Sequence, residues 1–255
     1  MSGDFRHGPA AGWLRPDWPA PPGVRAVSTT RAGGVSGGPY ASLNLGDHVD
    51  DDPAMVRQNR RILRETLALP AEPLWLSQVH GVRVVDAATA APGAQADAAV
   101  AFEPGVVCTV MTADCLPVLF CDLEGTRVGV AHAGWRGLCD GVLEATVAAL
   151  DCAPRRLLAW LGPAIGRAAF EVGDEVREAF RARDAGAGEA FRSSPNGHWL
   201  ADIYALARRR LTACGVTAIY GGGLCTHDDA ARFFSYRRER VTGRMASLIW
   251  LTDRA

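Results

Sequence analysis

Three apolar runs close together in the middle of the chain constrain its fold more strongly than any other sequence feature. They are "DAAVAF" at residues 97–102, "GVVCTVMTADCLPVLFCD" at 105–122 and "TRVGVAHAG" at 126–134. Short apolar runs with β-branched residues, bounded by turn-forming residues, are typical of β-strands. The sequence therefore predicts that the centre of the chain forms the strands of a β-sheet.

Helices are predicted on both sides of these runs, most clearly in the segment that starts near Asp51. Asp51 and Asp52 are candidate capping residues, Pro53 suits the first turn, and apolar residues then recur at helical spacing. Further helices are predicted at 138–150, 173–183 and 202–214.

Additional strands are expected towards both ends of the chain. They are predicted at 24–30, 74–87 (two short strands around Gly81), 156–166 (ending in a Pro/Gly loop), 217–223, 231–240 and 245–252. Strands and helices mix without the strict alternation of a parallel sheet. The order predicts an α+β fold with mixed sheets, in one catalytic domain at residues 23–255 after an extended segment at residues 1–22.

Charge and composition exclude several classes of partner. The 27 basic and 28 acidic residues give a net charge of −1, without the basic excess of a nucleic-acid-binding protein. No apolar run is long enough to span a membrane and no secretory signal is evident, so a cytoplasmic protein is expected. Every basic residue is an arginine, so lysine chemistry is excluded and arginine must bind any phosphate held by charge.

Three residues at the ends of apolar runs are candidates for chemistry: His80 in "LSQVHG", Cys115 in "MTADCLPV" and His132 in "AHAGWRG". Two imidazoles and a thiolate can hold Zn²⁺ with one position open, as in catalytic zinc sites. The small residues around His132 would let a metal and a flat ligand approach, with Trp135 as a pocket wall or a core residue. The alternative is a buried cysteine and two hydrogen-bonded structural histidines.

Arginines near these residues are candidates for anion binding. Arg60, on the helix after Asp52, and Arg136, beside His132, are predicted to clamp phosphate. Two other groups are interpreted as solvated: the arginines of "SYRRERVTGR" (Arg237, Arg238, Arg240 and Arg244) and the histidines of polar loops (His48, His198 and His227).

Several motifs together resemble one known family. "STTRAGGVS", "SLNLGDHVDDDP", "LSQVHG", "TADCLPVLF", "AHAGWRG", "FFSYRRE" and "TGRMASLIWL" are similar to motifs of the laccase-domain or YfiH-like family of purine nucleoside phosphorylases, long labelled polyphenol oxidases. The resemblance runs from about residue 14 to 252. It implies a single-domain, layered α/β/β/α sandwich with mixed β-sheets. It also implies a catalytic metal, taken as zinc, held by His80, Cys115 and His132.

The same resemblance implies phosphorolysis of adenosine, inosine, guanosine and methylthioadenosine, together with deamination of adenosine. Relatives are also described as editing factors for peptidoglycan precursors. In phosphorolysis Asn44 would contact the base or ribose, unless it only forms an Asx-turn. In deamination Asp114 would move a proton, unless its carboxylate caps a turn.

Other enzyme classes use similar residues. Cys115, activated by His80 or His132, would suit a cysteine-nucleophile amidohydrolase. Copper would also bind a His₂Cys site. A multicopper oxidase is disfavoured, because its copper sites need about ten histidines, largely in His-x-His pairs, and the chain has six histidines and no such pair.

Overall fold

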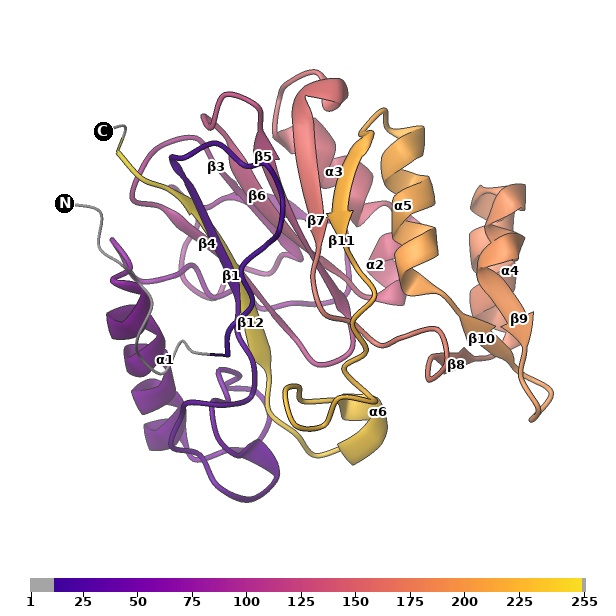
Figure 1. Ribbon diagram of the computed structural model, residues 1–255, viewed down its shortest axis with the longest axis horizontal. Helices are drawn as coiled ribbons and strands as arrows, with labels where there is room; N and C mark the ends of the chain where they lie inside the picture. The colour runs from indigo at the N-terminus through magenta and orange to yellow at the C-terminus, as the bar shows by residue number, and fades with distance from the viewer. Residues whose placement is uncertain (1–11, 254–255) are drawn as a thin grey trace.

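The computed structural model describes residues 12–253 and contains four layers in the order α/β/β/α (Figure 1). A helix from the first third of the chain covers a three-stranded sheet, and a six-stranded sheet packs on that sheet's other face. Helices from the second half of the chain cover the far face of the six-stranded sheet. The predicted layered α+β sandwich with mixed sheets is therefore confirmed.

The six-stranded sheet forms the centre of the molecule, in the strand order β11-β7-β5-β6-β3-β2. Its strands are β2 (Val84–Asp86), β3 (Ala98–Ala101), β5 (Leu116–Asp122), β6 (Val128–Ala133), β7 (Leu157–Leu161) and β11 (Ala218–Gly221). Strand β5 is antiparallel to both of its neighbours, whereas the two outermost pairs are parallel. Both β5 and β6 are buried along their whole length, which explains their continuous apolar sequences.

The three-stranded sheet is antiparallel, with β12 (Met245–Leu251) between β1 (Val24–Ser28) and β4 (Val107–Thr112). Helix α1 (Pro53–Leu67) covers its outer face, and Val56, Leu63 and Leu67 are buried as the helical spacing predicts. The cap is Asp52, whose side chain accepts a hydrogen bond from the Ala54 amide at 2.7 Å.

The helices on the opposite side pack on the six-stranded sheet. They are α2 (Trp135–Asp140), α3 (Val142–Ala149), α4 (Asp174–Arg183) and α5 (Ile203–Ala213). A small sheet of β8 (Glu171–Val172), β10 (Trp199–Ala201) and β9 (Phe191–Ser193) lies beside α4. Three short 3₁₀ helices in the described chain connect other elements: Gly38–Tyr40, Pro154–Arg156 and Ala185–Ala190.

Three predicted elements differ from the structure. The helix predicted at 138–150 is divided at Gly141, whose φ of 109° ends α2. The first strand of 74–87 is replaced by isolated bridges and a bend. The strand predicted at 231–240 is wrong: this segment is a loop followed by the short helix α6 (Tyr236–Glu239).

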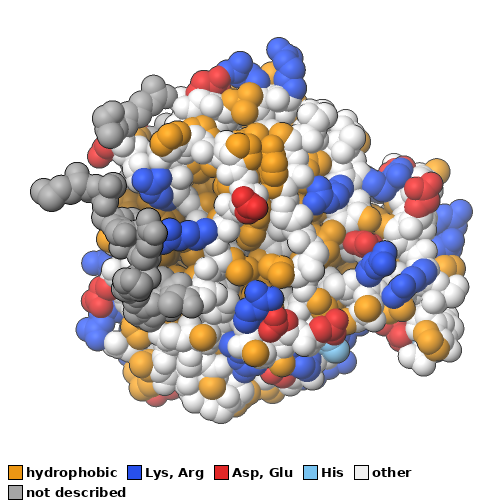
Figure 2. All heavy atoms as spheres, in the orientation of Figure 1, with side chains coloured by type: hydrophobic (Ala, Val, Ile, Leu, Met, Phe, Trp, Pro, Cys, Tyr) orange, Lys and Arg blue, Asp and Glu red, His pale blue; other side chains and the backbone are white. Residues whose placement is uncertain are grey.

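The ends of the described chain pack on the three-stranded sheet. Trp13 is buried in the core beneath α1, and Leu14 pairs with Ser28. The rest of the segment predicted to be extended, residues 1–11, lies outside the described residues. Within residues 12–253, no helix has the length and apolar character needed to cross a bilayer. Figure 2 shows basic and acidic side chains interspersed over one face of the molecule.

Candidate metal centre and active site

The three predicted ligand residues meet at one end of the six-stranded sheet. Strand pairing sets Leu116 opposite Ala133, so Cys115 and His132 lie at adjoining strand ends. His80 lies in the bend before β2 and reaches the same place. The ligand atoms of His80, Cys115 and His132 lie within 4.8 Å of one another, and the Cys115 Sγ is 3.8 Å from the His80 Nε2.

A buried carboxylate holds two of these ligand residues in position. Asp97, which is fully buried, accepts hydrogen bonds from the backbone amides of Val79, His80 and Gly81 at 2.7–3.2 Å. It also contacts the His132 Nδ1 at 2.8 Å, which leaves the Nε2 of that ring for the centre. Burial alone would raise the pKa of Asp97, but the hydrogen bonds from His132 and Gly81 hold that pKa below its usual value.

Two glycines in "AHAGWRG" make room for this arrangement. A Cβ atom on Gly134 would lie 2.7 Å from the His80 ring and 3.2 Å from the Cys115 Sγ. A Cβ atom on Gly137 would lie 2.7 Å from the carbonyl oxygen of Gly81. The small residues after His132 are thus required because the bend that carries His80 packs directly on the start of α2.

The charges in the cluster stabilise one another. Burial opposes ionisation of Cys115, but the neighbouring His132 and His80 rings lower the pKa of the Cys115 thiol to about 6. Burial likewise opposes protonation of His132, while Cys115 and Asp97 raise the pKa of His132. Without a metal, the arrangement favours a thiolate beside an imidazolium.

The donor set fits a metal ion. Ligand atoms in a tetrahedral zinc site with zinc–nitrogen and zinc–sulfur bonds are roughly 3.5 Å apart, close to the 3.8 Å between Cys115 Sγ and His80 Nε2. The three residues range from exposed His80 to buried His132, so the cluster has a side open to a ligand. Three protein ligands with an open position are the arrangement typical of catalytic zinc sites.

A small cavity of about 160 Å³ adjoins Cys115. Its lining is mainly apolar: Ala113, Trp135, Ile165, Phe170, Ile203 and Tyr236, with Asp114, Cys115 and Arg237 as the other members. Trp135 therefore forms a wall of this cavity, one of the two roles predicted for it. An apolar cavity beside a reactive centre is typical of a small-molecule site.

Asp114 organises one side of this cavity. Its φ is +90°, and its carboxylate accepts hydrogen bonds from the Thr226 hydroxyl at 2.6 Å, the Ser235 hydroxyl at 3.0 Å and the Arg237 amide at 2.6 Å. These three donors favour the structural role over the proton shuttle, because they already engage the carboxylate. Asp114 thereby joins the end of β4 to the distant segment at 225–244.

The predicted substrate contacts Asn44 and Arg60 are engaged within the protein. The Asn44 side chain bonds Gly46, Asp51 and the Arg244 amide, and forms the Asx-turn considered as its alternative. The Arg60 guanidinium donates to the Leu45 carbonyl at 3.0 Å, pairs with Asp47 and stacks on Trp75. The third predicted contact, Arg136, is exposed and stacks on Trp135 at 4.4 Å.

Two other arginines are less exposed than the sequence indicated. Arg237 lines the cavity. Burial lowers the pKa of Arg244, and its Nη1 donates to the Thr242 and Gly243 carbonyls at 2.9 and 3.1 Å. The interpretation of these residues as a solvated strand face is therefore wrong, although Arg240 is exposed. The only sequence signal was the density of arginine in "SYRRERVTGR".

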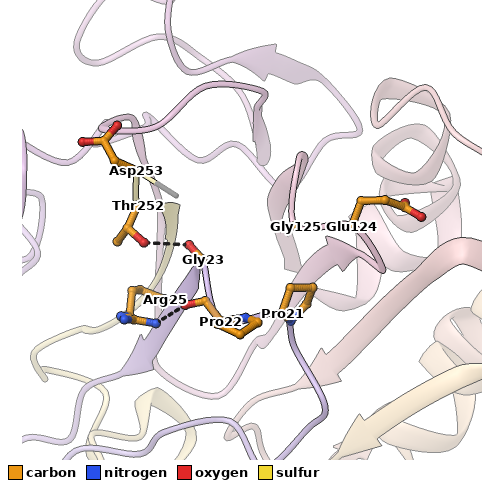
Figure 3. A pocket seen from close by; sticks show the side chains of 8 residues that line it. All are labelled: Pro21, Pro22, Gly23, Arg25, Glu124, Gly125, Thr252 and Asp253. Carbon is orange, nitrogen blue, oxygen red and sulfur yellow. Dashed lines mark hydrogen bonds between the residues drawn. The ribbon is translucent and has the colours of Figure 1, made fainter. Parts of the chain in front are cut away.

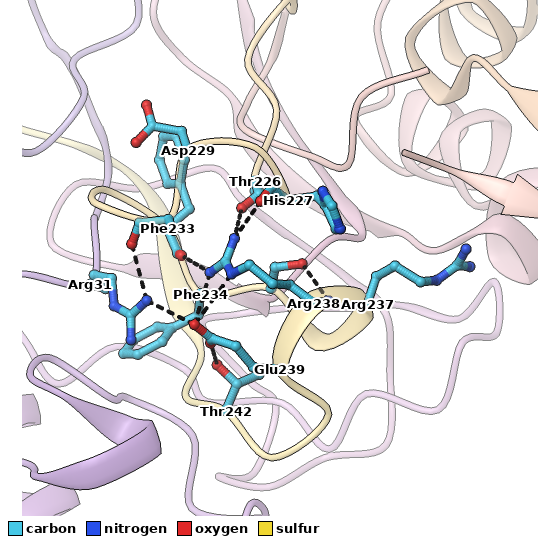
Figure 4. Close-up of polar contacts among 12 residues, drawn as sticks. Arg31, Thr226, His227, Asp229, Phe233, Phe234, Arg237, Arg238, Glu239 and Thr242 are labelled. Atoms are coloured by element: carbon cyan, nitrogen blue, oxygen red, sulfur yellow. Dashed lines mark hydrogen bonds and ion pairs between the residues drawn. The ribbon is translucent and has the colours of Figure 1, made fainter. Parts of the chain in front are cut away.

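Arg238 fixes the segment from which these arginines come (Figure 4). Its guanidinium donates to the carbonyls of Thr226, His227 and Phe233 at 2.6–2.8 Å and pairs with Glu239. Arg31 pairs with the same Glu239 carboxylate at 3.1 Å, so two cations share one anion.

The other histidines among residues 12–253 and a larger cavity lie apart from the ligand cluster. His48 and His198 are exposed and His227 is half-buried beside Asp228, and none belongs to the ligand cluster. A cavity of about 410 Å³ lies between the β1 start and the turn at Gly125 (Figure 3). That turn follows the end of β5 opposite to Cys115, and no His or Cys lines the cavity.

Comparisons with known proteins identify the family of this chain. Residues 25–252 match the family model described as "multi-copper polyphenol oxidoreductase laccase". The chain is 62% identical to a purine nucleoside phosphorylase of Pseudomonas aeruginosa, over 94% of this chain and 99% of that one. It is 58% identical to the purine nucleoside phosphorylase YfiH of Escherichia coli, over 92% and 97% of the two chains.

Solved structures show the same fold. A Neisseria meningitidis protein superposes with a TM-score of 0.91 at 53% identity, covering 94% of this chain and 99% of that one. YlmD from Geobacillus stearothermophilus superposes with a TM-score of 0.87 at 35% identity, over 98% and 100%. Fold and site define a layered α/β/β/α protein with a His–Cys–His centre. The chain belongs to the YfiH-like laccase-domain family.

Proposed function

We propose that this chain is a zinc-dependent purine nucleoside phosphorylase that acts on adenosine, inosine, guanosine and methylthioadenosine and also deaminates adenosine. The carrying observation is the His80–Cys115–His132 cluster, which adjoins a mainly apolar cavity of about 160 Å³. Its relatives named purine nucleoside phosphorylases match more than nine-tenths of the chain, which supports the same activity here.

In phosphorolysis an oxygen of inorganic phosphate bonds to the ribose C1′ while the bond from C1′ to the purine nitrogen breaks. The base leaves with the bonding electrons and takes up a proton. A zinc ion, when bound, supplies Lewis-acid polarisation of an oxygen ligand. The chain's own contribution is to hold phosphate beside the cluster, for which Arg136, exposed in the first turn of α2, is the predicted cation.

In deamination the oxygen of water bonds to C6 of adenosine, and the C6–N6 bond breaks as ammonia leaves with the proton from water. The same flat base and the same centre serve this reaction. Asp114 already accepts three hydrogen bonds, which favours a structural role for it over that of proton carrier in this reaction.

The test is elemental analysis of the purified protein combined with an adenosine assay run with and without phosphate. About one zinc per chain and phosphate-dependent release of adenine would support the proposal. Copper in place of zinc would correct the metal alone. Stoichiometric metal with no purine product from any of the four nucleosides would overturn the activity.

A second candidate is favoured by one specific arrangement. Cys115, His132 and Asp97 form a thiol–imidazole–carboxylate series, and the Asp97–His132 contact is 2.8 Å, as in enzymes with a cysteine nucleophile. Metal-replete protein distinguishes the two candidates, because a coordinated thiolate resists alkylation. Rapid iodoacetamide modification of Cys115 in metal-replete protein, with hydrolysis of an amide substrate, would favour the amidohydrolase.

A further inference from the structure

The proposed function does not say which part of the substrate the cavity beside Cys115 recognises. Its walls include the aromatic side chains of Trp135, Phe170 and Tyr236. The charged side chains in the lining are Asp114 and Arg237. An apolar, aromatic cavity with one available cation suits a flat heterocycle whose edge carries hydrogen-bond acceptors.

Phosphate fits this cavity poorly. The Asp114 carboxylate lies in the wall and would repel a dianion, and one arginine offers few donors for its oxygens. Arg136, by contrast, is exposed and lies outside this lining. The cavity therefore suits the base, with phosphate bound outside it.

Arg237 is held in place independently of any ligand. Its backbone amide donates to the Asp114 carboxylate at 2.6 Å, and its Nη1 donates to the Glu171 carbonyl at 2.7 Å. The guanidinium also lies 5.7 Å from the centre of the Phe170 ring. Its side chain points away from the Arg238 network (Figure 4). A guanidinium has five N–H donors, so one edge is anchored and others remain for a ligand.

We propose that Arg237 binds the O6 and N7 edge of a 6-oxopurine and makes this site selective for inosine and guanosine over adenosine. The proposal rests on the proposed function. Hypoxanthine and guanine present two acceptors on this edge, which match an arginine fork, whereas adenine presents an N6 donor beside N7. A cation at N7 also stabilises the negative charge that develops on the departing base.

The first experiment compares kcat/KM for phosphorolysis of inosine, guanosine and adenosine, followed as base release in saturating phosphate. Arg237→Ala should lower the values for inosine and guanosine by about 10- to 100-fold and the value for adenosine several-fold less. Arg237→Gln should favour adenosine, because a glutamine side chain pairs with N6 and N7 of adenine. Arg183→Ala, which removes an exposed surface arginine, is the matched control. Equal losses for all three nucleosides would overturn the proposal.

A binding measurement separates this inference from the proposed activity. Calorimetric titration of metal-loaded protein with hypoxanthine and with adenine requires no turnover. Wild-type preference for hypoxanthine, lost in Arg237→Gln, would support the inference even if phosphorolysis is absent and the proposed function fails. Equal affinity of the wild type for both bases would overturn the inference, while phosphate-dependent turnover would leave the proposed function standing.

Discussion

The metal half and the cavity half of the candidate site are built by different physical means. His80, Cys115 and His132 come from the ends of strands in one buried sheet, and the buried Asp97 carboxylate binds the backbone around them. The cavity half depends on the segment at 225–244, which is mostly loop and has few backbone hydrogen bonds to neighbouring strands.

In the cavity half, charged side chains make the contacts that a strand would make through backbone hydrogen bonds. Arg238 binds three carbonyls of the segment, Glu239 bridges Arg238 and Arg31, and Asp114 joins the segment to the end of β4. The contrast indicates that the predicted ligand residues depend on close-packed backbone, whereas the cavity wall depends on a satisfied polar network. Substitutions should therefore separate metal binding from substrate binding.

The largest effect is expected from removing the thiolate. Cys115→Ala should eliminate stoichiometric metal and lower activity by about a thousandfold or more, because only two imidazoles would remain to bind the metal. Elemental analysis and nucleoside turnover measure both effects. Cys152→Ala, at a half-buried cysteine outside the cluster, should keep metal and activity. Full phosphorolysis by the Cys115 variant would show that the cluster is not the centre.

The next effect concerns the buried carboxylate. Asp97→Asn replaces one carboxylate oxygen with an NH₂ group, which then faces two of the four groups that now contact the carboxylate, the Val79, His80 and Gly81 amides and the His132 ring. Metal affinity should fall about 10- to 100-fold. Competition with a chromogenic chelator measures this loss, and an unchanged affinity would mean that backbone packing alone holds the ligands.

Adding a methyl group beside the predicted ligand residues should have a smaller effect on metal binding. Gly134→Ala places a Cβ atom against the His80 ring and the Cys115 sulfur, and we expect roughly tenfold weaker metal binding from this steric displacement. Gly37→Ala is the matched control, since nothing lies within 4 Å of its Cβ position. If both variants bind metal like the wild type, the close packing around Gly134 is not required.

Substitutions in the cavity half should change stability and KM without loss of metal. Arg238→Ala leaves the carbonyls of Thr226, His227 and Phe233 without their guanidinium donor. Stability should fall by about 2–3 kcal/mol, and KM for nucleosides should rise several-fold at constant zinc content. Urea unfolding, kinetics and elemental analysis test these points. Arg232→Ala, whose ion pair with Asp229 lies at the surface, should change stability by less than about 0.5 kcal/mol.

Sequence patterns predicted the metal half better than the cavity half. The ends of apolar runs identified the positions that meet in space, because paired strands carry their end residues to one edge of a sheet. Asp97 opens one of these runs, but a single acidic residue before a strand does not reveal which amides it will bind. The clash at Gly134 likewise depends on the tertiary approach of the His80 bend.

The cavity half had no comparable signal. Phe233 and Phe234 are adjacent and both buried, so the segment lacks the alternation of a half-exposed strand, yet its composition resembled one. Its path depends on ion pairs across about 200 residues, such as Arg31 with Glu239. Such pairings leave no periodicity in the sequence. For the same reason the sequence did not indicate that Arg237 lines the cavity.

The smallest predicted effect is the pH dependence of the cavity half. Burial alone would raise the pKa of Glu239, but hydrogen bonds from Thr242, Arg238 and Arg31 hold that pKa below its usual value. A carboxyl with a lower pKa in the folded state stabilises the fold above its unfolded pKa of about 4.3. That contribution is lost as pH falls through the folded pKa.

Glu239→Gln should therefore reduce stability at pH 7 by about 1 kcal/mol and converge with the wild type in acid, since the protonated wild-type carboxyl resembles the amide. Urea unfolding of both proteins between pH 7 and pH 3 measures the difference. Glu178→Gln, at an exposed surface pair, should leave the pH profile unchanged. A constant difference at every pH would show that the shape of Glu239, rather than its charge, holds Arg31 and Arg238 together.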